Sequence, residues 1–192
     1  MEITNINQLD FTSSLYTYAD YILWKFKQRV EILKGRIFKM SAPSIVHQDI
    51  SRNLTISLTP FFKHTKCKLF YAPFDVVLKN KEGKEDTVVQ PDICIVCDPA
   101  KLADGKRCLG APDLVIEILS PGNTKRDIDD KFRLYEEVGV SEYWIVRPED
   151  KEVNIFVLEG NRYIGLAPVA KGKIIHSVKF PSLSINTNDI FE

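Results

Sequence analysis

The chain has 192 residues, of which 44% are hydrophobic and 27% are charged, and these proportions exclude a wholly disordered or collagen-like chain. Its 26 basic and 26 acidic residues give a formal net charge of zero, so a nucleic-acid partner would have to be held by a local patch. No apolar run approaches the roughly 18 residues of a membrane span, and the first residues lack a secretory signal, so we expect a cytoplasmic protein with no membrane partner.

The first elements expected in the chain are a short helix and a hairpin. Thr17–Phe26 (TYADYILWKF) suits a short helix. Val30–Leu33 and Arg36–Met40 are typical of two paired strands, because Lys34 and Gly35 between them suit a tight turn.

A longer helix and two strands are expected next. From Ser44 to about Phe62, apolar residues recur at helical spacing, and Ser44 suits the N-cap, which predicts a helix packed on the core. Runs typical of strands cover Leu69–Leu78 and Thr87–Cys97. The charged segment NKEGKED between them suits a solvated hairpin loop.

The third part of the chain predicts a strand, a helix and a second strand. Asp113–Leu119 is almost continuously apolar, as expected for a strand that is covered on both faces. A helix then runs to about Val138, where Gly139 can end it, and Glu142–Arg147 forms the next strand. A crossover of this kind places its two strands parallel.

The remaining residues predict a hairpin and a tail. Val153–Leu158 and Arg162–Leu166 are typical of paired strands, and the last residues, FPSLSINTNDIFE, resemble a short terminal extension. Because no internal repeat or linker interrupts the pattern, we expect a single α/β domain over residues 1–192.

The four cysteines predict neither a disulfide scaffold nor a zinc site. They are too sparse for a disulfide-rich fold, which favours a reducing compartment. Cys94 and Cys97 form a C-x-x-C, but on a strand their side chains point to opposite faces, and no second pair has zinc-ribbon spacing.

Two charged residues interrupt the apolar face of the helix that begins near Lys125. Asp127 and Lys131 project among its apolar residues, and they lie four positions apart, where they can contact each other. One interpretation is an internal ion pair at the rim of the core. The other is a role in a functional site.

Two carboxylates occupy unexpected positions on predicted strands. Glu117 lies inside the apolar run LVIEILS, and Asp92 follows Pro91 in VVQPDICIVC. A buried carboxylate is costly unless it is paired or binds a metal, and Mg²⁺ prefers such oxygen ligands. Asp92, Glu117 and Lys131 could therefore meet at one end of a sheet. Alternatively, Asp92 caps a loop and Glu117 pairs with Lys131 for structural reasons.

Three segments carry a family resemblance: QPDI at 90–93, APDLVIEILSP at 111–121 and EYWIV at 142–146. With Asp127, Lys131 and Tyr135, they resemble the Uma-type family of bacterial "putative restriction endonucleases" in the PD-(D/E)XK nuclease superfamily. Residues 17–20, 31–40 and 47 also match, so the resemblance covers most of the chain. It implies a restriction-endonuclease-like fold, an α+β sandwich in which a mixed central sheet is flanked by helices, with additional hairpins.

The resemblance also implies a catalytic set. Asp92 corresponds to the aspartate of the PD motif and Glu117 to the acid of the second motif, and with the backbone carbonyl of Ile118 they would hold Mg²⁺ or Mn²⁺. The superfamily's lysine normally lies two residues after that acid, where this chain has Leu119. Lys131 resembles a lysine that has migrated to the following helix.

Four more residues are expected to support the site. Glu31 resembles an additional glutamate that assists the metal, although it could be only a polar residue of a hairpin strand. His47 matches the family pattern, but a hydrogen-bonded core histidine is the main alternative. Gln90 could orient a water or the scissile phosphate, or be an exposed glutamine at a strand end. Asp127 belongs to the same motif as Lys131.

Two functions from different classes follow. The resemblance implies an endonuclease that needs Mg²⁺ or Mn²⁺ and hydrolyses phosphodiester bonds in DNA. A homodimer is also expected from the resemblance, because a nuclease of this size with little basic surface often needs a second subunit to span duplex DNA. The alternative is a catalytically inactive module with the nuclease fold that binds DNA or protein, in which Glu117, Lys131 and Asp127 form a buried ionic network. Dependence on a divalent metal distinguishes the two.

Overall fold

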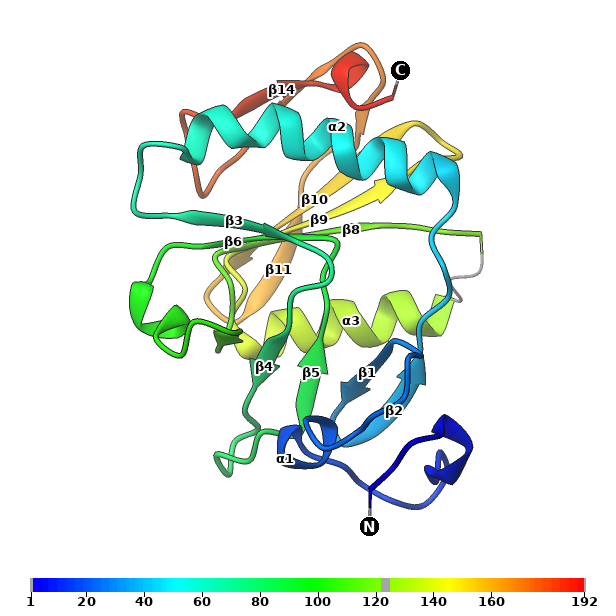
Figure 1. Cartoon of the computed structure of the whole chain (residues 1–192). Helices are drawn as coiled ribbons and strands as arrows, with labels where there is room; N and C mark the ends of the chain where they lie inside the picture. The colour runs from blue at the N-terminus through cyan, green and yellow to red at the C-terminus, as the bar shows by residue number, and fades with distance from the viewer. Residues whose placement is uncertain (1, 122–124, 192) are drawn as a thin grey trace.

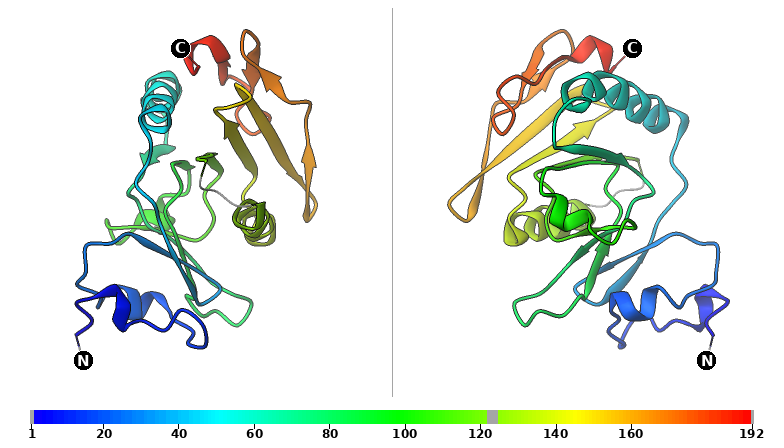
Figure 2. Two further views of the ribbon diagram at one scale, coloured as in Figure 1. Left: turned by 90° about the vertical axis from the view of Figure 1, so that its right-hand side faces the viewer. Right: turned by 60° about the vertical axis from the view of Figure 1, so that its left-hand side comes forward.

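Residues 2–121 and 125–191 of the protein are described in a computed structural model. Two sheets and a C-terminal hairpin make up most of it, and the helices α2 (Ile45–Phe62) and α3 (Lys125–Val138) lie on opposite sides of the larger sheet (Figures 1 and 2). The shorter helical elements are α1 (Tyr18–Tyr21), η1 (Ile6–Gln8), η2 (Pro99–Leu102) and η3 (Thr187–Asp189). Within the described ranges, no helix is long and apolar enough to cross a membrane.

The larger sheet is mixed and has the strand order β11-β10-β9-β8-β6-β3, with β12 paired to β10. Its strands are β3 (Lys68–Tyr71), β6 (Ile93–Val96), β8 (Leu114–Ile118), β9 (Glu142–Arg147), β10 (Glu152–Glu159), β11 (Arg162–Gly165) and β12 (Val169–Ala170). Strands β8 and β9 are parallel, and the other pairs are antiparallel. The predicted strand, helix and strand around α3 and the mixed central sheet are therefore confirmed.

The smaller sheet has the order β2-β1-β5-β4-β7 and lies below α3 in Figure 1. Its strands are β1 (Val30–Leu33), β2 (Arg36–Lys39), β4 (Val76–Leu78), β5 (Thr87–Val89) and β7 (Cys108–Leu109). Lys34 and Gly35 both have positive φ, at 49° and 81°, which is the backbone of a tight hairpin turn that matches strand twist. The predicted first hairpin is confirmed.

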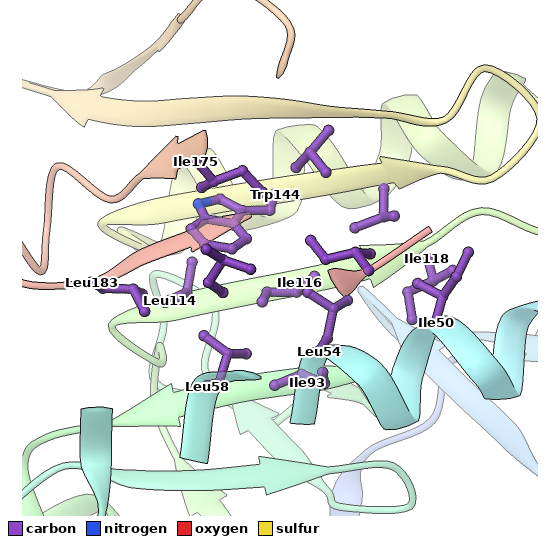
Figure 3. Packing of buried hydrophobic residues seen from close by; sticks show 14 of the residues in the cluster. Ile50, Leu54, Leu58, Ile93, Leu114, Ile116, Ile118, Trp144, Ile175 and Leu183 are labelled. Carbon is purple, nitrogen blue, oxygen red and sulfur yellow. The ribbon is translucent and has the colours of Figure 1, made fainter. Parts of the chain in front are cut away.

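Strand alternation divides the core into two layers. Leu114 and Ile116 of β8 face α2, where Leu54 and Leu58 pack against them, and Trp144 lies in the same layer (Figure 3). The intervening β8 residues face α3. All five residues of β8 are buried, as expected of a strand covered on both faces.

The two longer predicted strands are each divided between the two sheets. The first becomes β3 and β4, separated at Pro73, and the second becomes β5 and β6, separated at Pro91. A proline cannot donate to a strand ladder, so each run breaks where the chain passes from one sheet to the other. The prediction of two continuous strands was wrong, and the break places Gln90 and Asp92 at the junction of the sheets.

Two other sequence predictions need correction. The first helix is shorter than Thr17–Phe26, because α1 ends in a turn at residues 22–23 and Trp24 then forms a bridge with Ile3. The C-terminal residues are not an extension: β13 (Ile174–His176) and β14 (Ser184–Asn186) form a hairpin whose apolar side chains enter the α2 layer of the core (Figure 3).

One cysteine pair was not predicted. Cys67 and Cys97 form a disulfide, while Cys94 and Cys108 are free and buried. The register of β3 and β6 brings this pair together, because Lys68 lies opposite Val96 and the two cysteines are the next residues outward.

A buried carboxylate holds the C-terminal segment to β9. Glu142 is fully buried, and its Oε2 accepts hydrogen bonds from the Ser177 hydroxyl and from the backbone N–H groups of Val178 and Lys179, at 3.0, 2.9 and 2.7 Å. Its Oε1 accepts from the Trp144 indole at 2.5 Å.

We expect Glu142→Ala to destabilise the protein by at least about 3 kcal/mol, because several buried donors would lose their acceptor. For a chain of this size, that corresponds to a melting temperature about 6–12 °C lower. Thermal unfolding followed by circular dichroism measures it. Glu142→Gln keeps an acceptor oxygen and is the control; equal losses in both variants would contradict this account.

Candidate active site

A cleft of about 710 Å³ lies between the first hairpin, α2 and the ends of β8 and α3. Its lining includes most of the residues that the sequence singled out: Glu31, His47, Gln90, Asp92, Glu117, Ile118 and Lys131. Both sheets contribute to the cleft. Strand β1 belongs to the smaller sheet and Gln90 directly follows β5 of that sheet, whereas β8 belongs to the larger sheet. The cleft is therefore built at the junction where the two sheets meet.

Glu117 is a buried carboxylate of the cleft. Its position in β8 turns its side chain toward α3, where its Oε1 accepts hydrogen bonds from Lys131 Nζ at 2.9 Å and from the Tyr135 hydroxyl at 2.7 Å. Burial raises the pKa of Glu117 from 4.5 to about 7; Lys131 opposes this shift, whereas the charges of Asp92 and Glu31 add to it.

Lys131 joins two carboxylates from different sheets. Its Nζ lies 2.9 Å from Glu117 Oε1 and 3.0 Å from Glu31 Oε1. Burial disfavours the ammonium, but the charges of Glu117 and Glu31 outweigh burial and hold the pKa of Lys131 above its ordinary value. Lys131 is therefore a charged donor at neutral pH.

Glu31 is fixed from both sides. It is only 5% exposed, and its Oε1 accepts a hydrogen bond from the backbone N–H of Gln90 at 2.9 Å in addition to the one from Lys131. The hairpin turn sets the register of β1, so the fold holds this carboxylate beside α3 although 100 positions separate it from Lys131 in sequence.

Asp92 lies directly before β6, the strand that pairs with β8, and its carboxylate connects β8 with α2. Its Oδ2 accepts a hydrogen bond from the backbone N–H of Ile118 at 2.7 Å and lies 3.2 Å from His47 Nε2. Burial lowers the pKa of His47, but the hydrogen bond and charge of Asp92, with smaller contributions from Glu117 and Ile118, raise it overall. His47 Nδ1 is buried and has no hydrogen-bond partner among the described residues.

Gln90 connects the cleft to residues that the sequence analysis missed. Its Oε1 accepts two hydrogen bonds from Arg29, at 3.0 Å from Nε and 2.7 Å from Nη2, and its Nε2 donates to Asp75 at 2.8 Å and to the Tyr21 hydroxyl at 3.2 Å. Gln90 is therefore not an exposed strand-end residue. Arg29 lies two positions before Glu31, on the same side of an extended chain, and that spacing is the signal that could have revealed it.

The predicted residues converge in space, and their chemical roles stay predictions. Glu31, Glu117 and Lys131 are in direct contact, and Asp92 contacts His47. Ile118 lines the cleft with its backbone N–H bound to Asp92. The side chain of Asp127 lies outside the described residues.

The donor set fits a hard divalent cation. Among the described residues, no group of three or more His, Cys, Asp or Glu side chains is placed to hold one metal ion. The predicted set needs fewer side chains, since Mg²⁺ commonly takes one or two carboxylates and completes its shell with water. The charges of Asp92 and Glu31 both penalise ionisation of Glu117, so added positive charge in the cleft would relieve their repulsion.

Comparisons with known proteins agree with this fold. The model of the Uma2 family, described as "Putative restriction endonuclease", matches residues 18–188. An uncharacterized protein of Synechocystis sp. is 26% identical over 140 residues, which cover 71% of each chain. The crystal structure of a "putative nuclease belonging to DUF820" from Anabaena variabilis has a TM-score of 0.71 and 17% identity, covering 92% of this chain and 97% of the other. That last likeness concerns the fold.

Proposed function

Since the chain belongs to the Uma2 family, we propose that it is a metal-dependent endonuclease that hydrolyses phosphodiester bonds in DNA. The observation that carries the proposal is the contact of the partly buried Lys131, through Nζ, with both Glu31 and Glu117 at a cleft that Asp92 also lines. Perturbed titratable groups that converge in a cleft are typical of active sites.

Asp92, Glu117 and the backbone carbonyl of Ile118 would hold Mg²⁺ or Mn²⁺ in this proposal. The metal ion would polarise a phosphate oxygen and lower the pKa of a bound water. Asp92 is suited to this task because the Ile118 N–H and His47 orient its carboxylate through Oδ2.

Lys131 supplies positive charge in the proposed reaction. Because its pKa is raised, it stays protonated and is suited to stabilise developing negative charge on the phosphate or to orient the attacking water, rather than to accept a proton. Glu31 positions Lys131 through the 3.0 Å contact, and the Gln90 N–H holds Glu31 in turn.

One observation favours a second candidate, a catalytically inactive binding module. Lys131 is already paired with two carboxylates, so the same contacts could be a buried ionic network that only holds β1, β8 and α3 together. The two candidates differ in their need for metal.

Metal dependence is the direct test. We expect the purified protein to nick supercoiled plasmid with Mg²⁺ or Mn²⁺ and to lose this activity in EDTA, since the carboxylates alone supply no electrophile for the phosphate. Mn²⁺ binding measured by electron paramagnetic resonance should occur near one equivalent per chain. A protein that binds DNA equally well in chelator, binds no Mn²⁺ and cleaves nothing would be the module.

A further inference from the structure

The cleft has exposed apolar side chains beside its polar floor. Tyr71 is 60% exposed and Ile56 is 64% exposed, and both line the cleft. Within the described part of the chain, the Tyr71 ring packs on no other aromatic ring and its hydroxyl makes no hydrogen bond. The fold therefore presents this ring to whatever enters the cleft.

Tyr71 lies next to the proposed metal ligand Asp92. It ends the edge strand β3 and pairs with Ile93, the residue after Asp92. The next backbone N–H, that of Ala72, donates to the Asp92 carbonyl at 3.0 Å. These bonds place the backbone of Tyr71 beside that of Asp92, and both residues line the cleft in which the scissile phosphate is proposed to bind.

Cations line the same cleft, of which Lys39 and Arg52 are exposed and Arg29 is partly buried. Arg29 directly precedes β1, Lys39 ends β2 and Arg52 comes from α2. Arg29 donates hydrogen bonds from Nε and Nη2 to Oε1 of Gln90. Because a guanidinium has five N–H donors, Arg29 retains donors for a phosphate. In a chain of zero net charge, these three cations supply local positive charge for a nucleic acid beside a floor that carries Glu31, Asp92 and Glu117.

The exposed ring of Tyr71 and the cations of the cleft together favour single-stranded over duplex nucleic acid. A cationic groove with an exposed aromatic ring is the recurring design of sites that bind a single strand, because every base offers a face for stacking. In a duplex that face is covered by the neighbouring base pairs, so a ring beside the scissile phosphate would have no partner. We propose that the cleft takes an unpaired DNA strand, with one base stacked on Tyr71 and the backbone held by Arg29, Lys39 and Arg52.

This inference rests on the proposed nuclease function, but binding tests it separately. Fluorescence anisotropy in EDTA, with a labelled dT oligonucleotide and a duplex of equal length, measures affinity without cleavage. We expect the single strand to bind more tightly than the duplex. Tyr71→Ala should weaken single-strand binding by about 5- to 150-fold, the effect of losing one base stack, and leave duplex binding unchanged.

Matched variants identify the contact. Tyr71→Phe keeps the stacking face and should bind like wild type, and Ile164→Ala removes an exposed apolar side chain of β11 outside the cleft. Lys39→Ala should lower the salt dependence of binding, whereas Tyr71→Ala should not, because only the lysine neutralises a phosphate. Circular dichroism confirms that each variant is folded.

The outcomes separate this inference from the proposed function. Nicking of duplex plasmid together with equal affinity for both DNA forms, or an unaffected Tyr71→Ala variant, would overturn the single-strand site and leave the nuclease proposal standing. Tight single-strand binding that depends on Tyr71, without cleavage in any metal, would support the site and contradict the nuclease. A wild-type protein that binds neither DNA form overturns the inference.

Discussion

Glu117→Gln is expected to lower metal-dependent DNA cleavage by at least about 10²- to 10³-fold while the protein remains folded. The amide preserves the size of the side chain but removes the anionic oxygen proposed to bind the metal, and removing one electrostatic contributor to a transition state commonly costs this much. Folding should persist because Lys131 keeps an anionic partner, Glu31, at 3.0 Å.

The measurement compares nicking of supercoiled plasmid, and cleavage of a single strand, by wild type and variant purified in the same way. Glu159→Gln, which changes an exposed glutamate at the end of β10, carries the same change of charge and should be fully active. If wild type and Glu117→Gln cleave equally, the activity belongs to a contaminant or the site is misplaced. Asp92→Asn should lose activity as Glu117→Gln does, because neither carboxylate can replace the other.

Lys131→Met is expected to remove activity and to destabilise the fold, most strongly at high pH. The substitution leaves Glu31 and Glu117 buried without their shared cation, and breaking a buried ion pair costs about 3–5 kcal/mol. At pH 8 the melting temperature should fall by roughly 6–20 °C.

The pH dependence of this loss follows from Glu117. Lys131 lowers the pKa of Glu117 in the folded protein, so removing it moves that pKa further above its ordinary value of 4.5. The folded variant then holds a proton that the unfolded chain releases, and its stability falls as the pH rises from about 4.5 through the folded pKa. Melting at pH 5 and pH 8 measures the difference.

Lys131→Arg is the matched variant, since it keeps the charge and changes the shape. It should recover most of the stability at pH 8, and its residual activity reports how much the reaction needs the compact ammonium. A Lys131→Met protein that melts like wild type at both pH values would show that the contacts with Glu31 and Glu117 contribute no net stability.

The local pattern of the chain was enough to predict much of the fold. Helical spacing and a Ser44 cap predicted α2, the continuous apolar run predicted β8, and the turn at Lys34 and Gly35 predicted the first hairpin. These features depend on residues that are close in sequence, so periodicity and turn geometry determine them. Asp92, Glu117 and Lys131 became candidates in the same way, because each one breaks the pattern of its own element.

Only the tertiary structure decided which distant residues meet. Sequence alternation cannot show that the runs around Pro73 and Pro91 divide between two sheets, because strand pairing depends on partners far along the chain. The contact between Glu31 and Lys131 and the link from Arg29 to Gln90 arise from that division. The sequence by itself determined which charged residues lie within otherwise apolar elements. The junction of the two sheets brings those residues into one cleft, and this junction exists only in the tertiary structure.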